Sequence, residues 1–183
     1  MSDLLYDAFP GHEVSLVFAR GLPLSALTSG LRGMNREPLA EGEAGGWVWA
    51  VHDMVNDELE DWENVDYPQV CPQGAEVVVF VTEPCSAKAH GPGFSYLRDG
   101  GWTLSFSFED LSQRGGDNPD YLSAELLAAG LIGPGSECTE WETEEGHDCY
   151  EEHESDREIR IARAIAEAFA LPSPPLALAV TAP

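Results

Sequence analysis

The feature that most constrains the fold is an alternating stretch at residues 93–110, GFSYLRDGGWTLSFSFED, which predicts a β-hairpin. In its second half, large apolar side chains alternate with hydroxyl side chains, as in a strand with one apolar and one polar face. Asp99, Gly100 and Gly101 between the halves tolerate the positive φ angles of a tight hairpin turn. We therefore expect a half-buried antiparallel sheet with a core on one side and water on the other. The predicted core face is formed by Trp102, Leu104, Phe106 and Phe108.

Three further segments are predicted to be strands. Residues 13–20 alternate between two apolar faces, and residues 46–52 form a nearly continuous apolar run. Residues 75–82 are rich in valine, which suits a pleated surface and few helices. The polar, glycine-rich residues 36–46 between the first two of these predict a surface loop.

Three segments are predicted to be helical. Leucines at helical spacing follow Pro23 and precede Gly33, which predicts a short amphipathic helix and thus an opening β-α unit. Asn118 and Pro119 predict the start of a second helix that ends near Gly130 or Gly133. A capping box of Ser155 and Glu158 predicts the start of the third. Its apolar stripe is predicted to contain Ile161, Ile165, Ala168 and Phe169.

The length of 183 residues, 43% of them hydrophobic, suits one domain with a substantial core. We predict a single α+β domain over residues 1–183. It contains a mainly antiparallel β-sheet, an N-terminal β-α unit and two C-terminal helices packed on one face.

The charge balance is far from neutral. The chain has 33 acidic and 9 basic residues, a formal net charge of −24. Such a field repels nucleic acid and anionic membranes, and it favours basic proteins, cations or solvent. The sequence has no apolar run of about 20 residues and no basic N-terminal region of a secretory signal. We therefore expect a cytoplasmic protein that binds neither nucleic acid directly nor membranes, with its four cysteines as thiols or metal ligands.

Two acidic tracts carry much of this charge. Residues 53–66 hold seven carboxylates, and residues 137–158 hold eleven carboxylates with one base, Arg157. Each tract contains one tryptophan, which would suit a hot spot for a basic protein partner or an anchor of the tract onto the core. The residues predicted to bind such a partner are Trp62, Asp57, Glu60, Asp61, Trp141, Glu142, Glu144 and Glu145.

The second tract also contains residue types that bind zinc, namely Cys138, His147, Cys149 and His153. Their spacing, C-x8-H-x-C-x3-H, does not form the two close ligand pairs of a zinc finger or ribbon. The sequence therefore favours a solvated acidic segment over a zinc site, and we predict no cofactor. Weak binding of divalent cations by the surrounding carboxylates is the softer alternative.

Signals for catalysis are sparse. The sequence contains no G-x-S-x-G motif, and its glycines form no phosphate-binding fingerprint. Cys85 has Lys88 and His90 close behind it, bases that would activate a thiol if the loop held them together. A half-buried structural cysteine at a strand end is the simpler interpretation, and we predict no catalytic residue.

Several segments together resemble a family of actinobacterial proteins that is a domain of unknown function. They are Phe9-Pro10-Gly11, SLVFARGL at 15–22, GGWVWAVHD at 45–53 and FSYLRDGGWTLSFSFEDL at 94–111. The resemblance implies a strand that ends in Arg-Gly, a short helix, a tryptophan strand, a hairpin and two C-terminal helices. It implies no active site. The chain departs from the family at residues 53–71 and 137–158, where it is richer in charge.

These observations favour a non-enzymatic acidic protein that binds a basic macromolecule, as an immunity or antitoxin-like factor or as a mimic of nucleic-acid charge. The alternative is a small-ligand-binding protein or an enzyme whose cleft the sequence does not identify. A structural accessory without independent activity also stays open.

Overall fold

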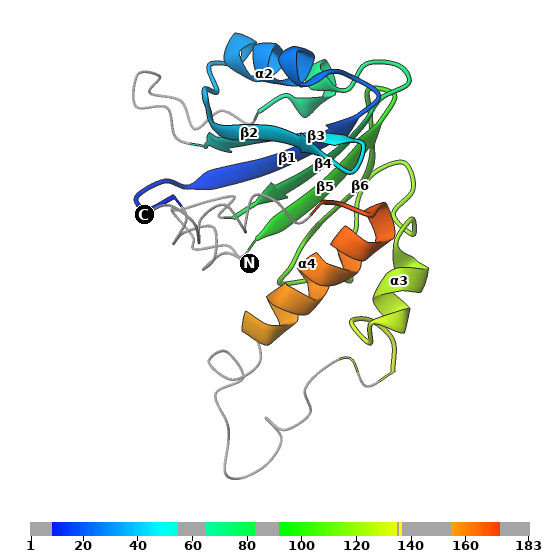
Figure 1. The fold of residues 1–183 in the computed structure, drawn as a ribbon. Coiled ribbons are helices and arrows are strands. Elements are labelled where there is room, and N and C mark those ends of the chain that lie inside the picture. The colour runs from blue at the N-terminus through cyan, green and yellow to red at the C-terminus, as the bar shows by residue number, and fades with distance from the viewer. Residues whose placement is uncertain (1–8, 55–64, 83–91, 135, 137–154, 173–183) are drawn as a thin grey trace.

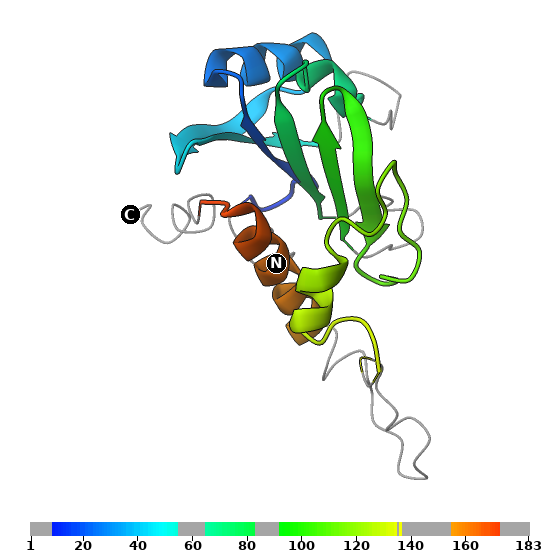
Figure 2. The same ribbon diagram turned by 90° about the vertical axis from the view of Figure 1, so that its right-hand side faces the viewer.

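The computed structural model describes residues 9–54, 65–82, 92–134, 136 and 155–172. They form three layers, with one helix above a six-stranded sheet and two helices below it (Figure 1). The view in Figure 2 shows the same separation, with α2 on one side of the sheet and α3 and α4 together on the other. The predicted α+β class and the opening β-α unit are confirmed. Within the described ranges, no helix combines the length and apolar character needed to cross a membrane.

The sheet is antiparallel throughout and has the order β2-β3-β1-β4-β5-β6. The order places the first strand at the centre, because β3 pairs with one of its edges and β4 with the other. The strands are β1 (Val14–Arg20), β2 (Pro38–Ala44), β3 (Trp47–Asp53), β4 (Glu76–Val81), β5 (Gly93–Arg98) and β6 (Gly101–Ser107).

Both faces of the sheet are covered, although the hairpin sequence predicted water on one side. In β1, Val14, Leu16 and Phe18 belong to the core beneath α4, whereas Val17 and Ala19 belong to the core beneath α2. Two separate cores form because alternate side chains of a strand point to opposite faces. The central strands are consequently apolar on both sides, as their near-continuous apolar sequences require.

The prediction of a surface loop at residues 36–46 is wrong, because this segment contains β2. The strand alternates partly buried small residues, among them Ala40 and Gly42, with exposed Glu41 and Glu43. A Cβ atom at Gly42 would lie 2.6 Å from the Trp49 ring, so the side-chain-free residue lets the two strands pair closely. Acidic residues and a glycine resemble a loop in the sequence, yet they suit an edge strand that is open to solvent on one side.

The hairpin at residues 93–110 is confirmed, with a turn at Asp99 (φ 53°) and Gly100 (φ 83°). The predicted burial of Trp102 is wrong, because 39% of it is exposed. A register shift pairs Tyr96 with Leu104 but Leu97 with Trp102. Cross-strand partners point to the same face of a sheet. The bulge therefore places Trp102 on the face of Leu97, whereas Leu104 lies with Tyr96 on the face covered by α4.

Within the described residues, each of the three predicted helices is present, although their bounds and buried stripes differ in detail. They are α2 (Leu24–Gly33), α3 (Ser123–Ala128) and α4 (Ser155–Phe169), with a 3-10 turn, η1, at Tyr67–Val70. The helix predicted to start at Asn118 and Pro119 begins later, at Ser123, after a loop in which Arg114 donates to the carbonyls of Leu111 and Pro119. In α4 the predicted stripe contains Ala164 in place of Ala168, which is exposed.

Candidate functional site

The residues predicted from the sequence to bind a partner lie outside the described residues. This holds for Asp57, Glu60, Asp61 and Trp62 in the first tract and for Trp141, Glu142, Glu144 and Glu145 in the second. The four potential zinc ligands, Cys138, His147, Cys149 and His153, and the thiol of Cys85 also lie outside them. No group of three or more histidine, cysteine or carboxylate side chains that could hold a metal ion occurs in the part of the chain that is described.

The described residues that flank the two tracts lie at the same end of the sheet. At this end Asp53, the last residue of β3, pairs with Val14, and the backbone N–H of Met54 donates to the carbonyl of Glu13. Arg157, in the first turn of α4, donates to the carbonyl of Glu109, just past β6. The β pairings bring the start of β1 and the ends of β3 and β6 to this same end. The chain therefore leaves for the first tract and returns from the second at the same end of the sheet, with β1, β4 and β5 between the two places.

At least six of the nine basic side chains contact other groups of the described fold. Arg20 donates to Glu76 and lies over the Trp47 ring, and Arg32 donates to Glu37. Further arginines with contacts in the described residues are Arg98, paired with Asp99, Arg114, paired with Asp120, and Arg157 and Arg160, which donate to backbone carbonyls. Neither residues 55–64 nor residues 137–154 contain a basic side chain other than histidine. Of the arginines named here, only Arg157 lies within one of the two tracts, near the end of the second.

A buried polar cluster lies beneath α2, close to the end of the sheet where the first tract begins. His52 is fully buried, its Nδ1–H donates to the carbonyl of Asp53 at 2.9 Å, and its Nε2 accepts from the Tyr67 hydroxyl at 3.1 Å. Burial lowers the pKa of His52 from 6.5 to about 4, and the nearby positive charge of Arg36 acts in the same direction. Burial likewise raises the pKa of Tyr67. Both groups are therefore neutral at physiological pH and act as a satisfied hydrogen-bonded pair inside the core.

The buried His52 predicts that the protein loses stability in acid. The imidazole of His52 binds a proton near pH 6.5 in the unfolded chain and only near pH 4 in the native protein. Its contribution to stability is therefore fully present well above pH 6.5 and is lost as the pH drops towards 4. We expect His52 alone to lower the free energy of unfolding by about 2 kcal/mol between pH 7 and pH 5. Urea denaturation of the wild type and of His52→Gln at both pH values measures the difference in pH dependence.

The His52 variant should show a shallower pH dependence than the wild type, because it lacks the group that takes up a proton on unfolding between about pH 4 and pH 6.5. Equal pH dependence in the His52 variant and the wild type would contradict the assignment.

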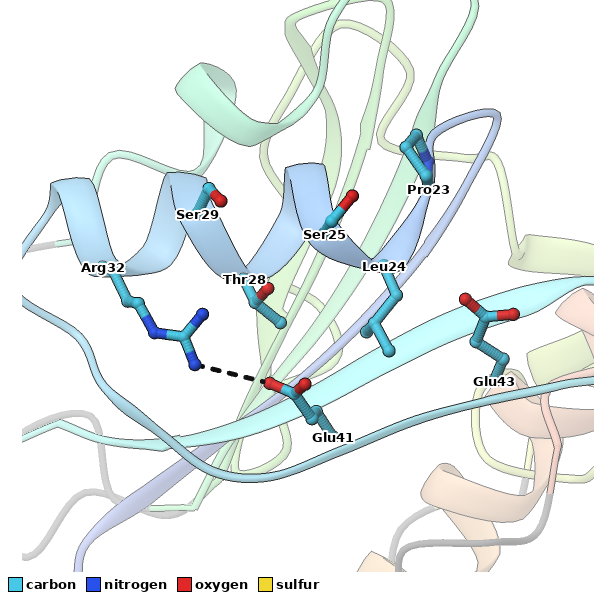
Figure 3. Close-up of a pocket in the computed structure, with 8 residues that line it drawn as sticks. All are labelled: Pro23, Leu24, Ser25, Thr28, Ser29, Arg32, Glu41 and Glu43. Carbon is cyan, nitrogen blue, oxygen red and sulfur yellow. Dashed lines mark ion pairs between the residues drawn. The ribbon is translucent and has the colours of Figure 1, made fainter.

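A groove with a volume of about 480 Å³ separates α2 from the edge strand β2 (Figure 3). From the helix, Leu24, Thr28 and Arg32 project at four-residue intervals, and Ser25 and Ser29 add hydroxyl groups. From the strand, Glu41 and Glu43 project towards the helix. The groove therefore combines hydroxyl groups, two carboxylates and one guanidinium.

Within the groove, Arg32 is held by two carboxylates. Its guanidinium lies 2.9 Å from the Glu37 carboxylate and 3.7 Å from that of Glu41. The side chains of Arg32 and Glu41 stay 47% and 41% exposed, so this pairing contributes little to stability. With Glu43 included, the lining has a net negative charge and is accessible to a cationic ligand.

The sequence analysis missed this groove because it assigned residues 36–46 to a loop. The signal that could have shown it is the alternation of small and acidic residues in Ala40-Glu41-Gly42-Glu43-Ala44, which has the period of a strand. The buried pair of His52 and Tyr67 had no such signal, since the two residues are distant in sequence.

Comparison of the chain with protein-family models, with curated proteins and with solved structures gives no match. The resemblance to an actinobacterial domain of unknown function therefore stays a prediction from the sequence.

Proposed function

We propose that this protein is a non-enzymatic binding protein that associates with a basic macromolecular partner through its two acidic tracts. The role would be that of an immunity or antitoxin-like factor or of a mimic of nucleic-acid charge. The observation that carries the proposal is the arrangement of the flanking residues: Met54 and Arg157 place the exit to one tract and the return from the other at the same end of the sheet.

The charge distribution supports this proposal. Four of the arginines named above, Arg20, Arg32, Arg98 and Arg114, pair with carboxylates that lie outside the two tracts. A carboxylate at about every second residue makes each tract a dense run of negative charge, the sign that duplex DNA carries at one charge per ~1.7 Å of its axis. The negative field would speed the association of a basic partner, and the tryptophan in each tract would add apolar contact to the complex.

The test is a pull-down of basic proteins at two salt concentrations. We expect the wild-type protein to retain proteins of high isoelectric point at about 0.05 M salt and to lose them at about 0.5 M, because salt screens exposed charges. Two variants neutralise the tracts: Asp57→Asn, Glu60→Gln and Asp61→Asn in the first, and Glu142→Gln, Glu144→Gln and Glu145→Gln in the second. Each should reduce the recovery several-fold.

The matched control removes the same charge elsewhere, through Asp117→Asn, Glu125→Gln and Glu167→Gln. These three residues are exposed, and they lie in the loop after β6, in α3 and near the end of α4. The control variant should recover basic proteins like the wild type. If all variants and both salt concentrations recover the same proteins, the proposed function is wrong.

A further inference from the structure

The outer edge of β2 offers a place for an additional strand. Among the described strands β2 stands at one end of the sheet and pairs only with β3. The backbone N–H and C=O groups on the other side of an edge strand can pair with an extended segment of another chain. The seven residues of β2 are long enough for such a segment to pair along several residues.

The side chains of β2 indicate which kind of segment would fit. Ala40, Gly42 and Ala44 lie on the face of the sheet that contains Trp49. Because side chains of a strand alternate, Glu41 and Glu43 lie on the opposite face, towards α2, where they are exposed. An added strand alternates its side chains with the same period and would place every second one over these carboxylates. Leu39, which is 39% exposed, adds apolar contact area at the start of the strand.

Charge distinguishes a basic segment from a second copy of this chain. The whole chain has a net charge of −24, and two β2 strands side by side would bring Glu41 and Glu43 of both copies together. Like charges on paired strands are destabilising, whereas opposite charges at these positions are favourable. Acidic side chains on an edge therefore exclude self-association and admit a cationic strand.

The groove beneath α2 provides room for the cationic side chains. Its volume of about 480 Å³ is lined by both carboxylates and, from the helix, by residues that include Leu24, Thr28 and Arg32. Arg32, held between Glu37 and Glu41, is the group in the lining that opposes a cation.

We propose that an extended segment with arginine or lysine at alternate positions adds to the outer edge of β2 and places its cationic side chains over Glu41 and Glu43 in the groove beneath α2. The inference rests on the proposed function, because it specifies the chemistry of a basic partner. It assigns that partner a second contact, separate from the acidic tracts.

The experiment measures fluorescence anisotropy of a labelled peptide of alternating arginine and valine, added to the full chain at low salt. Glu41→Gln with Glu43→Gln should weaken binding about tenfold, since two cationic side chains lose their charged partners. Arg32→Gln should strengthen binding, because it removes the opposing charge. The control pair Glu125→Gln with Glu167→Gln should leave the affinity unchanged.

Two N-methylated peptides test whether the backbone pairs. In an extended strand, the amides of odd and even residues point to opposite edges, so methylation of one set should abolish binding and methylation of the other should not. If both methylated peptides bind like the parent, or if the Glu41 and Glu43 variant binds like the wild type, the β2 site is wrong.

The acidic-tract variants separate this inference from the proposed function. They should lose basic proteins in the pull-down and still bind the peptide. If the tract variants lose basic proteins but the variant with Glu41→Gln and Glu43→Gln binds the peptide as tightly as the wild type, only the strand-addition site is wrong. Protein capture that is insensitive to tract charge and salt would overturn the proposed function, whatever the peptide does.

Discussion

Replacement of Gly21 by alanine should lower the free energy of unfolding by roughly 3 kcal/mol or more. Gly21 follows β1 with a φ of +85°, a conformation that side chains with a Cβ rarely adopt. A Cβ there would lie 2.5 Å from the carbonyl oxygen of Gly74 and 3.0 Å from the Cα of Ala75. These are backbone atoms just ahead of β4, which pairs with β1, so relief of the overlap would displace the central pair of strands. Urea denaturation followed by circular dichroism measures the loss.

Gly74→Ala is the matched control for this substitution. Gly74 has the same φ of +85°, but nothing lies within 4 Å of a Cβ placed there. Its replacement should cost only the backbone strain, about 1 kcal/mol. Equal losses in the two variants would show that the contact between Gly21 and Gly74 does not constrain the fold.

Phe106→Ala should lower the free energy of unfolding by about 3–5 kcal/mol, because it leaves a cavity in the core beneath α4. Phe106 is 5% exposed, and its ring centroid lies 5.0 Å from that of Phe94 and 6.3 Å from that of Phe108. Phe94 in turn contacts Phe80 and Phe169, so the loss affects the contact between the sheet and α4. Chemical denaturation at neutral pH, monitored by circular dichroism, measures the effect.

Trp102→Ala on the same strand provides the comparison. The alternation of the sequence assigns Trp102 and Phe106 to one face, yet 39% of Trp102 is exposed. Its removal should cost about 1 kcal/mol or less, as at other partly exposed positions. If Trp102→Ala lowers the free energy of unfolding as much as Phe106→Ala does, then Trp102 belongs to the same core as Phe106 and the bulge does not place the two side chains on different faces.

The period of apolar residues was sufficient to predict the strands with large side chains. Residues 13–20, 46–52 and 75–82 correspond to β1, β3 and β4, and the turn at Asp99 and Gly100 is the one predicted. The strand made of small and acidic residues was mistaken for a loop, because its burial comes from backbone pairing with β3 and leaves no run of large apolar side chains. The same error hid the groove and the edge strand, which carry the further inference.

The residues of the two tracts could be proposed from composition alone, since their charge density is visible in the sequence. Their placement at the same end of the sheet could not be predicted, because it depends on strand pairing and on contacts such as that of Arg157 with the carbonyl of Glu109, 48 positions away. The buried pair of His52 and Tyr67 was hidden for the same reason, since a histidine in an apolar strand does not reveal its partner.

The sequence by itself determined the α+β class, the hairpin, most of the strands and the position of the negative charge, because these follow from local periodicity, turn chemistry and composition. Only the tertiary structure decided that both faces of the sheet are covered, that Trp102 leaves the core, that β2 forms an acidic edge beside α2 and that His52 is held neutral. These features depend on which distant segments become neighbours, and strand pairing and packing between layers determine that choice.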